Sequence, residues 1–107
     1  METIHKIGRR KTAVARVYLS EGKGEVTIND RKLDNYFTTE TLKYKVLQPL
    51  TLTENLSSYD IKAKVFGGGI TGQAEAIRLA ITRALVEVNE EFKSVLKPEG
   101  LLTRDPR

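Results

Sequence analysis

Two stretches of the chain alternate between apolar and polar residues with a period of two, the pattern of a half-buried β-strand. In residues 12–19 the apolar face consists of Ala13, Ala15, Val17 and Leu19. In residues 59–66 it consists of Ile61, Ala63 and Val65, and Lys62, Lys64 and Phe66 lie opposite. A third strand is predicted at 25–28, after a glycine-bearing turn at 20–24. We therefore expect 12–19 and 25–28 to form a hairpin, followed by a turn at 29–32.

The clearest helix follows three consecutive glycines. Its apolar positions recur at spacings of three and four residues, and they are Ile70, Ala74, Ile77, Ile81, Ala84 or Leu85, and Val88. Leu79 and Val86 lie nearly opposite this stripe, so the helix is expected to be buried on two sides. The apolar residues after Val88 are the expected second partner.

The segment between the predicted strands 25–28 and 59–66 is expected to form shorter helices. Residues 33–37 form a helical turn, and Thr38 or Thr39 caps a helix that continues to about Leu47. Pro49 is expected to stop this helix. Residues 50–58 are compatible with a loop or a short helix.

The order strand, strand, helix, strand, long helix predicts an α+β fold, a two-layer sandwich of a mainly antiparallel sheet with helices on one side. Neither an internal repeat nor a linker interrupts the 107 residues. We therefore expect one domain over 1–107, with a basic N-terminal arm at 1–11 and a C-terminal extension at 97–107 that begins with a turn.

Composition excludes several classes of protein. The chain has no cysteine and one histidine, so disulfides, thiolate chemistry and a zinc site are excluded, and no metal or cofactor is predicted. Catalysis by a serine–histidine–aspartate set would need His5, close to the terminus. The sequence contains no apolar run of about 20 residues and no secretory signal, so we expect a cytoplasmic protein without membrane contact.

The positive charge is concentrated near the N-terminus. The net charge is +4. Residues 1–20 contain five basic side chains and one acidic one, while the other 87 residues contain 13 of each sign. Lys6, Arg9, Arg10 and Lys11 are followed by a strand that places Arg16 and Tyr18 on one face. Cations beside an aromatic ring suit phosphate neutralisation with stacking on a base, although a solvated basic face with Tyr18 covering the sheet explains the same pattern.

The stretch GGGITGQ at 67–73 connects a predicted strand to the long helix. Glycines before a helix N-terminus can expose backbone N–H groups to an anion, but no Walker or GxGxxG pattern is present. A tight turn is the simpler explanation, yet close approach by a phosphate or ribose accounts better for Gly67, Gly68, Gly69 and a fourth glycine at Gly72. Along the helix, Gly72, Ala76 and Ala80 form a small-residue patch near Gln73 and Arg83. It indicates either tight helix packing or an RNA backbone along the helix.

Four segments together resemble one known family. The segments are GRRKTAVARV, INDR with the following Leu33 and Tyr36–Phe37, GGGITGQAEAIRLAITRAL, and the late LLTRDPR. They are similar to ribosomal protein nine of the small subunit, bacterial type. The resemblance covers essentially the whole chain. It implies a structural constituent of the small-subunit head that binds rRNA, neighbours other head proteins, supports translation near the peptidyl-tRNA site and has no catalytic role. It also implies a left-handed β–α–β crossover.

The resemblance implies rRNA contacts in four regions. They are Arg9, Arg10, Lys11 and Arg16 near the N-terminus, Gly67 to Gly69 with Gln73 at the turn, Arg78 and Arg83 on the helix, and Arg104 and Arg107 at the end. Family members continue into a basic C-terminal tail that reaches tRNA, whereas this sequence stops at Arg107, so no residue here is assigned to tRNA. The alternative function is a nucleotide-binding, small-metabolite kinase-like domain that uses the glycine turn. A third possibility is a protein-only interaction module.

Overall fold

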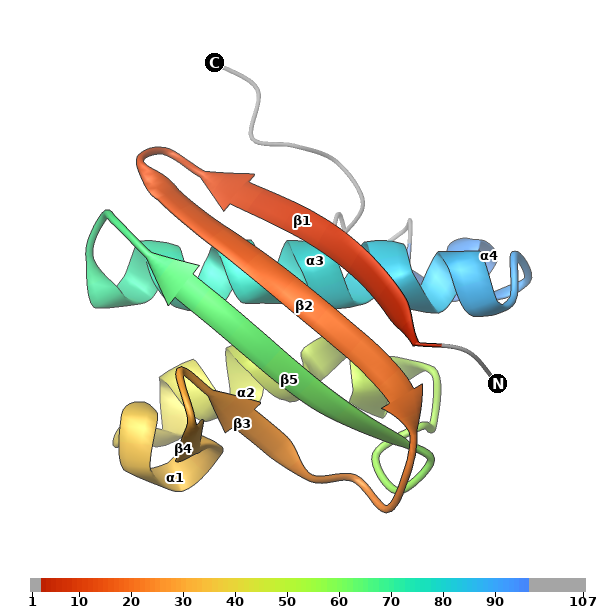
Figure 1. Ribbon diagram of the computed structural model, residues 1–107. Coiled ribbons are helices and arrows are strands. Elements are labelled where there is room, and N and C mark those ends of the chain that lie inside the picture. The colour runs from red at the N-terminus through yellow and green to blue at the C-terminus, as the bar shows by residue number, and fades with distance from the viewer. Residues whose placement is uncertain (1–2, 97–107) are drawn as a thin grey trace.

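The computed structural model describes residues 3–96, which form one mixed five-stranded sheet with helices on one face (Figure 1). The strand order is β1-β2-β5-β3-β4. Three of the four strand pairs are antiparallel and one is parallel. The expected α+β, mainly antiparallel two-layer sandwich is therefore confirmed. The predicted C-terminal extension at 97–107 lies outside the described residues.

The first strand corrects the expected N-terminal arm. Ile4–Arg10 forms β1, which pairs in antiparallel fashion with β2 (Ala13–Glu21) along its whole length. The two strands are joined by a tight turn at Lys11 and Thr12, where Lys11 has a φ of 56°. Most of the region expected as an arm is thus an edge strand, and its cations have fixed directions relative to the sheet.

The predicted hairpin between residues 12–19 and 25–28 is wrong. β3 (Val26–Ile28) does not pair with β2, because β5 (Tyr59–Phe66) lies between them. The carboxylate of Asp60, near the start of β5, accepts hydrogen bonds from the backbone N–H groups of Lys23, Gly24 and Glu25 at 3.0–3.1 Å. These bonds hold the β2–β3 loop against the start of β5. The sequence pattern predicts β2, β3 and β5 with nearly correct bounds, but it carries no information about which strands pair.

β3 and β5 are adjacent and parallel, joined through β4 (Arg31–Lys32), α1 (Leu33–Tyr36) and α2 (Glu40–Leu52). When Figure 1 is turned so that both strands point upward, β5 lies to the right of β3 while α2 passes behind the sheet. This is the left-handed sense, which is rare among such connections. It agrees with what the family resemblance implies.

The short helices agree with the sequence except at Pro49. The hydroxyl of Thr39 accepts a hydrogen bond from the N–H of Leu42 and caps α2, as predicted. Pro49 does not stop α2, which continues to Leu52 with the proline ring buried. A proline removes one intrahelical hydrogen bond, but here only three helical residues follow it, and burial of the ring offsets part of that cost.

The long helix α3 (Ile70–Val88) packs against the sheet and also contacts α2 and α4 (Phe92–Leu96). Ile77, Ile81 and Leu85 are completely buried, and Leu79 on the other side is 7% exposed. Burial on two sides is therefore confirmed, and α4, which belongs to the segment expected as the second partner, contacts α3. No helix of the described part of the chain is long and apolar enough to cross a membrane.

Candidate nucleic-acid interface

Two of the glycines in GGGITGQ are required by the turn itself. Gly67 and Gly68 have φ values of 80° and 61°, a region that residues with a Cβ rarely adopt. A Cβ on Gly67 would also collide with the carbonyl oxygen of Thr12, and one on Gly68 would lie 3.0 Å from Cβ of Ala13. The turn packs against the β1–β2 connection, so close approach by RNA is not needed to explain these two residues.

Gly69 and Gly72 have no such requirement. An added Cβ at Gly69 would meet nothing within 4 Å, and one at Gly72 would make ordinary contacts of 3.8 Å with Ala13 and Arg10. Gly69 is the N-cap of α3 and offers no capping side chain. Both glycines line a cavity of about 280 Å³ beside Lys11, Thr12 and Thr71. These two positions leave room for another molecule at the N-terminus of α3.

This difference predicts the effect of single substitutions on folding. Gly67→Ala is expected to lower the free energy of unfolding by about 2 kcal/mol, because it combines an unfavourable φ with a steric conflict. Gly69→Ala is expected to change it by less than about 1 kcal/mol, since its φ of −95° suits any residue and the space around it is open. Urea denaturation followed by circular dichroism measures both, and equal losses would contradict the distinction between the two glycines.

Gln73 connects the glycine turn to the rest of the fold through two hydrogen bonds within the protein. Its Nε2 donates a hydrogen bond of 3.0 Å to the carbonyl oxygen of Gly67, and its Oε1 accepts one of 2.6 Å from the hydroxyl of Tyr36. The side chain therefore connects the turn to α1. Gln73 was expected to donate to RNA, but in the structure its amide is engaged within the protein.

Arg10 also has an internal partner. Its Nε donates to Oε1 of Glu75 on α3, and Nζ of Lys45 on α2 lies 3.0 Å from Oε2 of the same carboxylate. Glu75 is only 18% exposed. Burial by itself would raise the pKa of Glu75, but the hydrogen bonds from Arg10 and Lys45 hold it below its ordinary value. The cluster joins β1, α2 and α3, so Arg10 serves the fold.

The small-residue patch on α3 is a packing surface. A Cβ on Gly8 of β1 would collide with the carbonyl oxygen of Ala76 and lie 2.7 Å from the backbone nitrogen of Ala80. Both alanines are completely buried. Of the two alternatives for this patch, tight packing therefore holds for Ala76 and Ala80, because β1 occupies this side of the helix.

Three more predicted contacts are used within the fold. Nη1 of Arg83 donates a hydrogen bond of 2.8 Å to the carbonyl oxygen of Ile7, and Nη1 of Arg78 donates to Gln48 at 3.2 Å. Burial lowers the pKa of Arg78 from its ordinary value. Nζ of Lys6 lies 2.9 Å from a carboxylate oxygen of Glu87. Arg104 and Arg107 lie outside the residues that the structure describes.

The remaining predicted cations are directed to solvent. Arg9, Lys11 and Arg16 are exposed. Arg9 and Arg16 lie on the sheet face opposite the helices, and Lys11 lies at the β1–β2 turn. Tyr18, on the same face, stacks on His5 with ring centroids 4.4 Å apart and an interplanar angle of 5°. These residues are available for contacts with another molecule.

Sequence analysis missed Lys62 and Lys64 as candidates, although it placed both on one face of 59–66. Pairing of β2 with β5 puts Lys62 opposite Tyr18 and Lys64 opposite Arg16. Both lysines are exposed. The missing information was the strand order, without which two polar faces cannot be combined into one surface. Among residues 3–96, no cluster of three or more acidic or histidine side chains has a geometry that could hold a metal ion.

Comparison with known proteins agrees with the motifs described above. The family model described as ribosomal protein S9/S16 matches residues 8–107. Small ribosomal subunit protein uS9 of Christiangramia forsetii is 69% identical over 107 residues, which cover all of this chain and 84% of the relative. The uS9 proteins of Flavobacterium psychrophilum and Cytophaga hutchinsonii are 62% and 58% identical over the same shares. Identity of this level over the entire sequence, together with the family-model match, shows that the chain belongs to the ribosomal protein S9/S16 family.

Proposed function

We propose that this chain is a structural constituent of the small ribosomal subunit that binds rRNA in the subunit head. The observation that carries the proposal is the 69% identity with a small-subunit protein over the whole chain. The exposed cations Arg9, Lys11 and Arg16 supply the chemistry, since cations without internal carboxylate partners can neutralise phosphates and release their counterions. The whole chain acts as one rRNA-binding unit on the cytoplasmic ribosome.

The rRNA contacts in this proposal are a reduced set of those expected from the sequence. It keeps Arg9, Lys11, Arg16 and Tyr18, and the uncrowded glycines Gly69 and Gly72. It leaves out the side chains that the fold already uses, which are Lys6, Arg10, Gln73, Arg78 and Arg83. Recognition then depends on the shape of folded RNA and its backbone more than on base edges.

The role in this proposal is non-catalytic. Glu75 is the acidic side chain at the cavity beside the glycines, and Arg10 and Lys45 already bind its carboxylate. It is therefore poorly placed to bind Mg²⁺ or accept a proton, as a kinase-like reaction would require. Other head proteins are the proposed protein neighbours.

Binding to RNA at several salt concentrations tests the proposal. The chain is expected to prefer an isolated head-domain fragment of small-subunit rRNA over an unrelated structured RNA of equal length, and to keep that preference at physiological salt. Filter binding or fluorescence anisotropy measures both affinities. Equal affinity for the two RNAs, lost as salt rises, would overturn the proposed function.

The salt dependence also tests individual cations. Substituting Arg9 and Lys11 together with alanine is expected to flatten the slope of log affinity against log salt by up to about 1.4–1.8, at roughly 0.7–0.9 per phosphate contact. Arg10 is left unchanged because its loss would disturb the Glu75 cluster. Substitution of the exposed Lys23 and Lys93 with alanine is the matched control. If the salt slope of this variant equals that of the control, Arg9 and Lys11 do not contact rRNA phosphates.

A further inference from the structure

The sheet face that the described helices leave uncovered carries residues from all five strands; we call it the open face. One row of directly paired residues crosses the whole sheet on this face. Its members, from β1 to β4 in spatial order, are His5, Tyr18, Lys62, Thr27 and Lys32. Directly opposite residues in paired strands point to the same side of a sheet. The row is therefore a continuous strip of side chains on one surface.

Two shorter rows lie beside the first. They consist of Ile7, Arg16 and Lys64, and of Arg9, Val14 and Phe66. The three rows together contain five cations, which are Arg9, Arg16, Lys32, Lys62 and Lys64, and no carboxylate. Phe66 is 57% exposed and adds an aromatic ring to the stacked pair of His5 and Tyr18. The open face thus combines dense positive charge with three aromatic side chains.

Little within the described part of the chain neutralises these cations. Lys64 lies 3.2 Å from Asp30, but both side chains are about half exposed or more, so this pair contributes little to folding. Arg16 and Lys62 make no ion pair with any residue in 3–96. Arg16 also stands directly opposite Lys64, and like charges in that position destabilise a sheet. The folded chain alone therefore gains little stability from this arrangement of cations.

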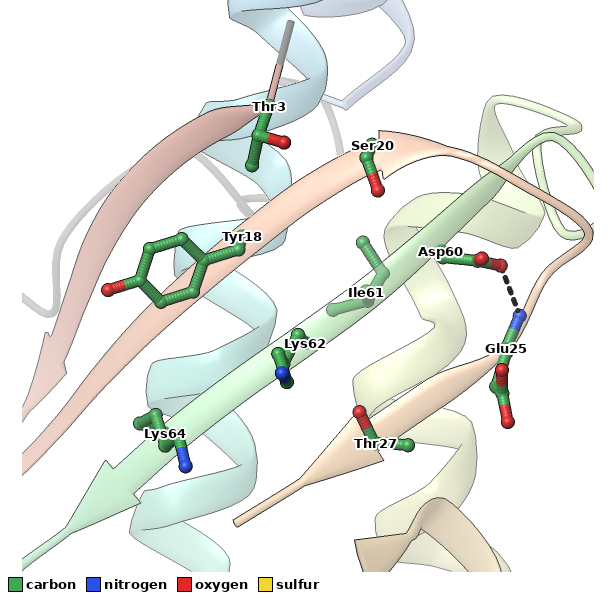
Figure 2. Close-up of a pocket in the computed structure, with 9 residues that line it drawn as sticks. All are labelled: Thr3, Tyr18, Ser20, Glu25, Thr27, Asp60, Ile61, Lys62 and Lys64. Carbon is green, nitrogen blue, oxygen red and sulfur yellow. Dashed lines mark hydrogen bonds between the residues drawn. The ribbon is translucent and has the colours of Figure 1, made fainter. Parts of the chain in front are cut away.

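The open face is hollowed between β2, β5 and β3. A cavity of about 570 Å³ lies there, and Figure 2 shows Lys62 and Lys64 of β5 between Tyr18 of β2 and Thr27 of β3. The opposite end of the cavity is acidic, with Asp60 and Glu25. Asp60 already accepts three backbone hydrogen bonds from the β2–β3 loop, and these lower its pKa. The surface has a polarity, with cations toward the β1–β2 turn and carboxylates toward the β2–β3 loop.

We propose that the open face is an rRNA-docking surface in which Arg16, Lys62 and Lys64 contact backbone phosphates and Tyr18 and Phe66 contact sugars or bases. The inference rests on the proposed function and extends it to residues of β5. An RNA backbone fits because it supplies the negative charge that the three rows lack, while aromatic side chains on a sheet can stack unpaired bases. A protein partner would need an acidic surface of matching shape, and only a narrow strip around Ile7, Val14 and Phe66 is apolar.

The test compares two variants of equal net charge. In the open-face variant, glutamine replaces Arg16, Lys62 and Lys64. In the control variant, glutamine replaces Lys23 in a loop, Lys43 on α2 and Lys93 on α4. Affinity of each full chain for the isolated head-domain rRNA fragment is measured at several salt concentrations. The open-face variant is expected to lose between about tenfold and a hundredfold at 0.15 M salt, with a slope reduced by roughly 2–3. The control is expected to lose much less.

Folding stability provides a second readout. Removal of like charges that face one another is expected to leave the urea midpoint of the open-face variant equal to or above that of the unchanged chain. Weaker rRNA binding with an undiminished midpoint supports docking on this face. Equal losses of affinity in both variants would overturn the proposal, because binding would then depend on total charge and not on this face. An unchanged affinity of the open-face variant would also overturn it and would indicate that a protein neighbour covers the face. If the unchanged chain shows no preference for head rRNA, the proposed function itself fails.

Discussion

Gly8→Ala is expected to lower the free energy of unfolding by about 3 kcal/mol. The new Cβ would collide with the carbonyl oxygen of Ala76 and lie 2.7 Å from the backbone nitrogen of Ala80. Both are main-chain atoms of α3, so neither moves aside as a flexible side chain would. Overpacking of a well-packed interior costs about 1–3 kcal/mol, and rigid backbone partners place Gly8 at the upper end.

The cost extends beyond the steric conflict. If β1 moves away from α3, it weakens three interactions that depend on their spacing, namely Lys6 with Glu87, Arg10 with Glu75, and Arg83 with the carbonyl of Ile7. Urea denaturation followed by circular dichroism is expected to show a midpoint lowered by about 1–2 M. A marginal total stability of about 5–15 kcal/mol makes this a large fraction of the whole.

Gly72→Ala is the matched control for Gly8→Ala. It adds the same methyl group to a glycine within α3, where the nearest atoms lie 3.8 Å away. Because alanine favours the helix over glycine by about 1 kcal/mol, this variant is expected to be slightly more stable than the unchanged chain. Similar midpoints for Gly8→Ala and Gly72→Ala would contradict the close packing of β1 on α3.

The position of Gly8 also explains why sequence analysis missed β1. The residues of β1 that face α3 are Ile4, Lys6, Gly8 and Arg10. Only the first of these is apolar, since two are charged partners of helix carboxylates and one is a glycine in close contact. Periodicity detects a strand only when its buried face is apolar, as in residues 12–19 and 59–66. Those two strands and α3 were accordingly predicted with nearly correct bounds.

The candidate interface was predictable to a similar extent. Sequence analysis identified the basic segment at 6–16, but it could not distinguish Arg9, which is exposed, from Arg10, which binds Glu75. The partner of Arg10 is 65 residues away, and that of Arg83 is 76 residues away. Pairings of this length depend on strand order and helix packing, neither of which a single sequence specifies. For the same reason, the sequence alone does not show that Lys62 and Lys64 share a surface with Arg16.

Glu75→Gln is expected to destabilise the fold by about 2 kcal/mol at neutral pH, and the loss is expected to shrink in acid. The carboxylate of Glu75 binds both Arg10 and Lys45, and hydrogen bonds to charged groups contribute about 1.5–3 kcal/mol. Glutamine keeps the size of the side chain but removes the charge and one acceptor oxygen. The two cations, which are 27% and 23% exposed, would then lack their shared anion.

The direction of the pH dependence follows from the pKa of Glu75. Hydrogen bonds from Arg10 and Lys45 outweigh burial and hold this pKa below the ordinary value of 4.5. A carboxyl group whose pKa is lower in the folded state stabilises the protein above the unfolded pKa, and this contribution is lost as pH falls through the folded pKa. The difference in unfolding free energy between the unchanged chain and Glu75→Gln should therefore be constant above about pH 6 and decline below about pH 4.5.

Urea denaturation at pH values between 3 and 7 measures this difference directly. Acid destabilisation through Asp60 and other carboxylates is common to both proteins, so it cancels in the comparison. Glu87→Gln is the matched control, because its ion pair with Lys6 is 35% and 54% exposed and such surface pairs contribute at most about 1 kcal/mol. Two results would contradict the prediction: a loss of unfolding free energy for Glu75→Gln equal to that for Glu87→Gln, or a loss that does not change between pH 3 and 7. Either would show that the cluster joining β1, α2 and α3 does not stabilise the fold through its charge.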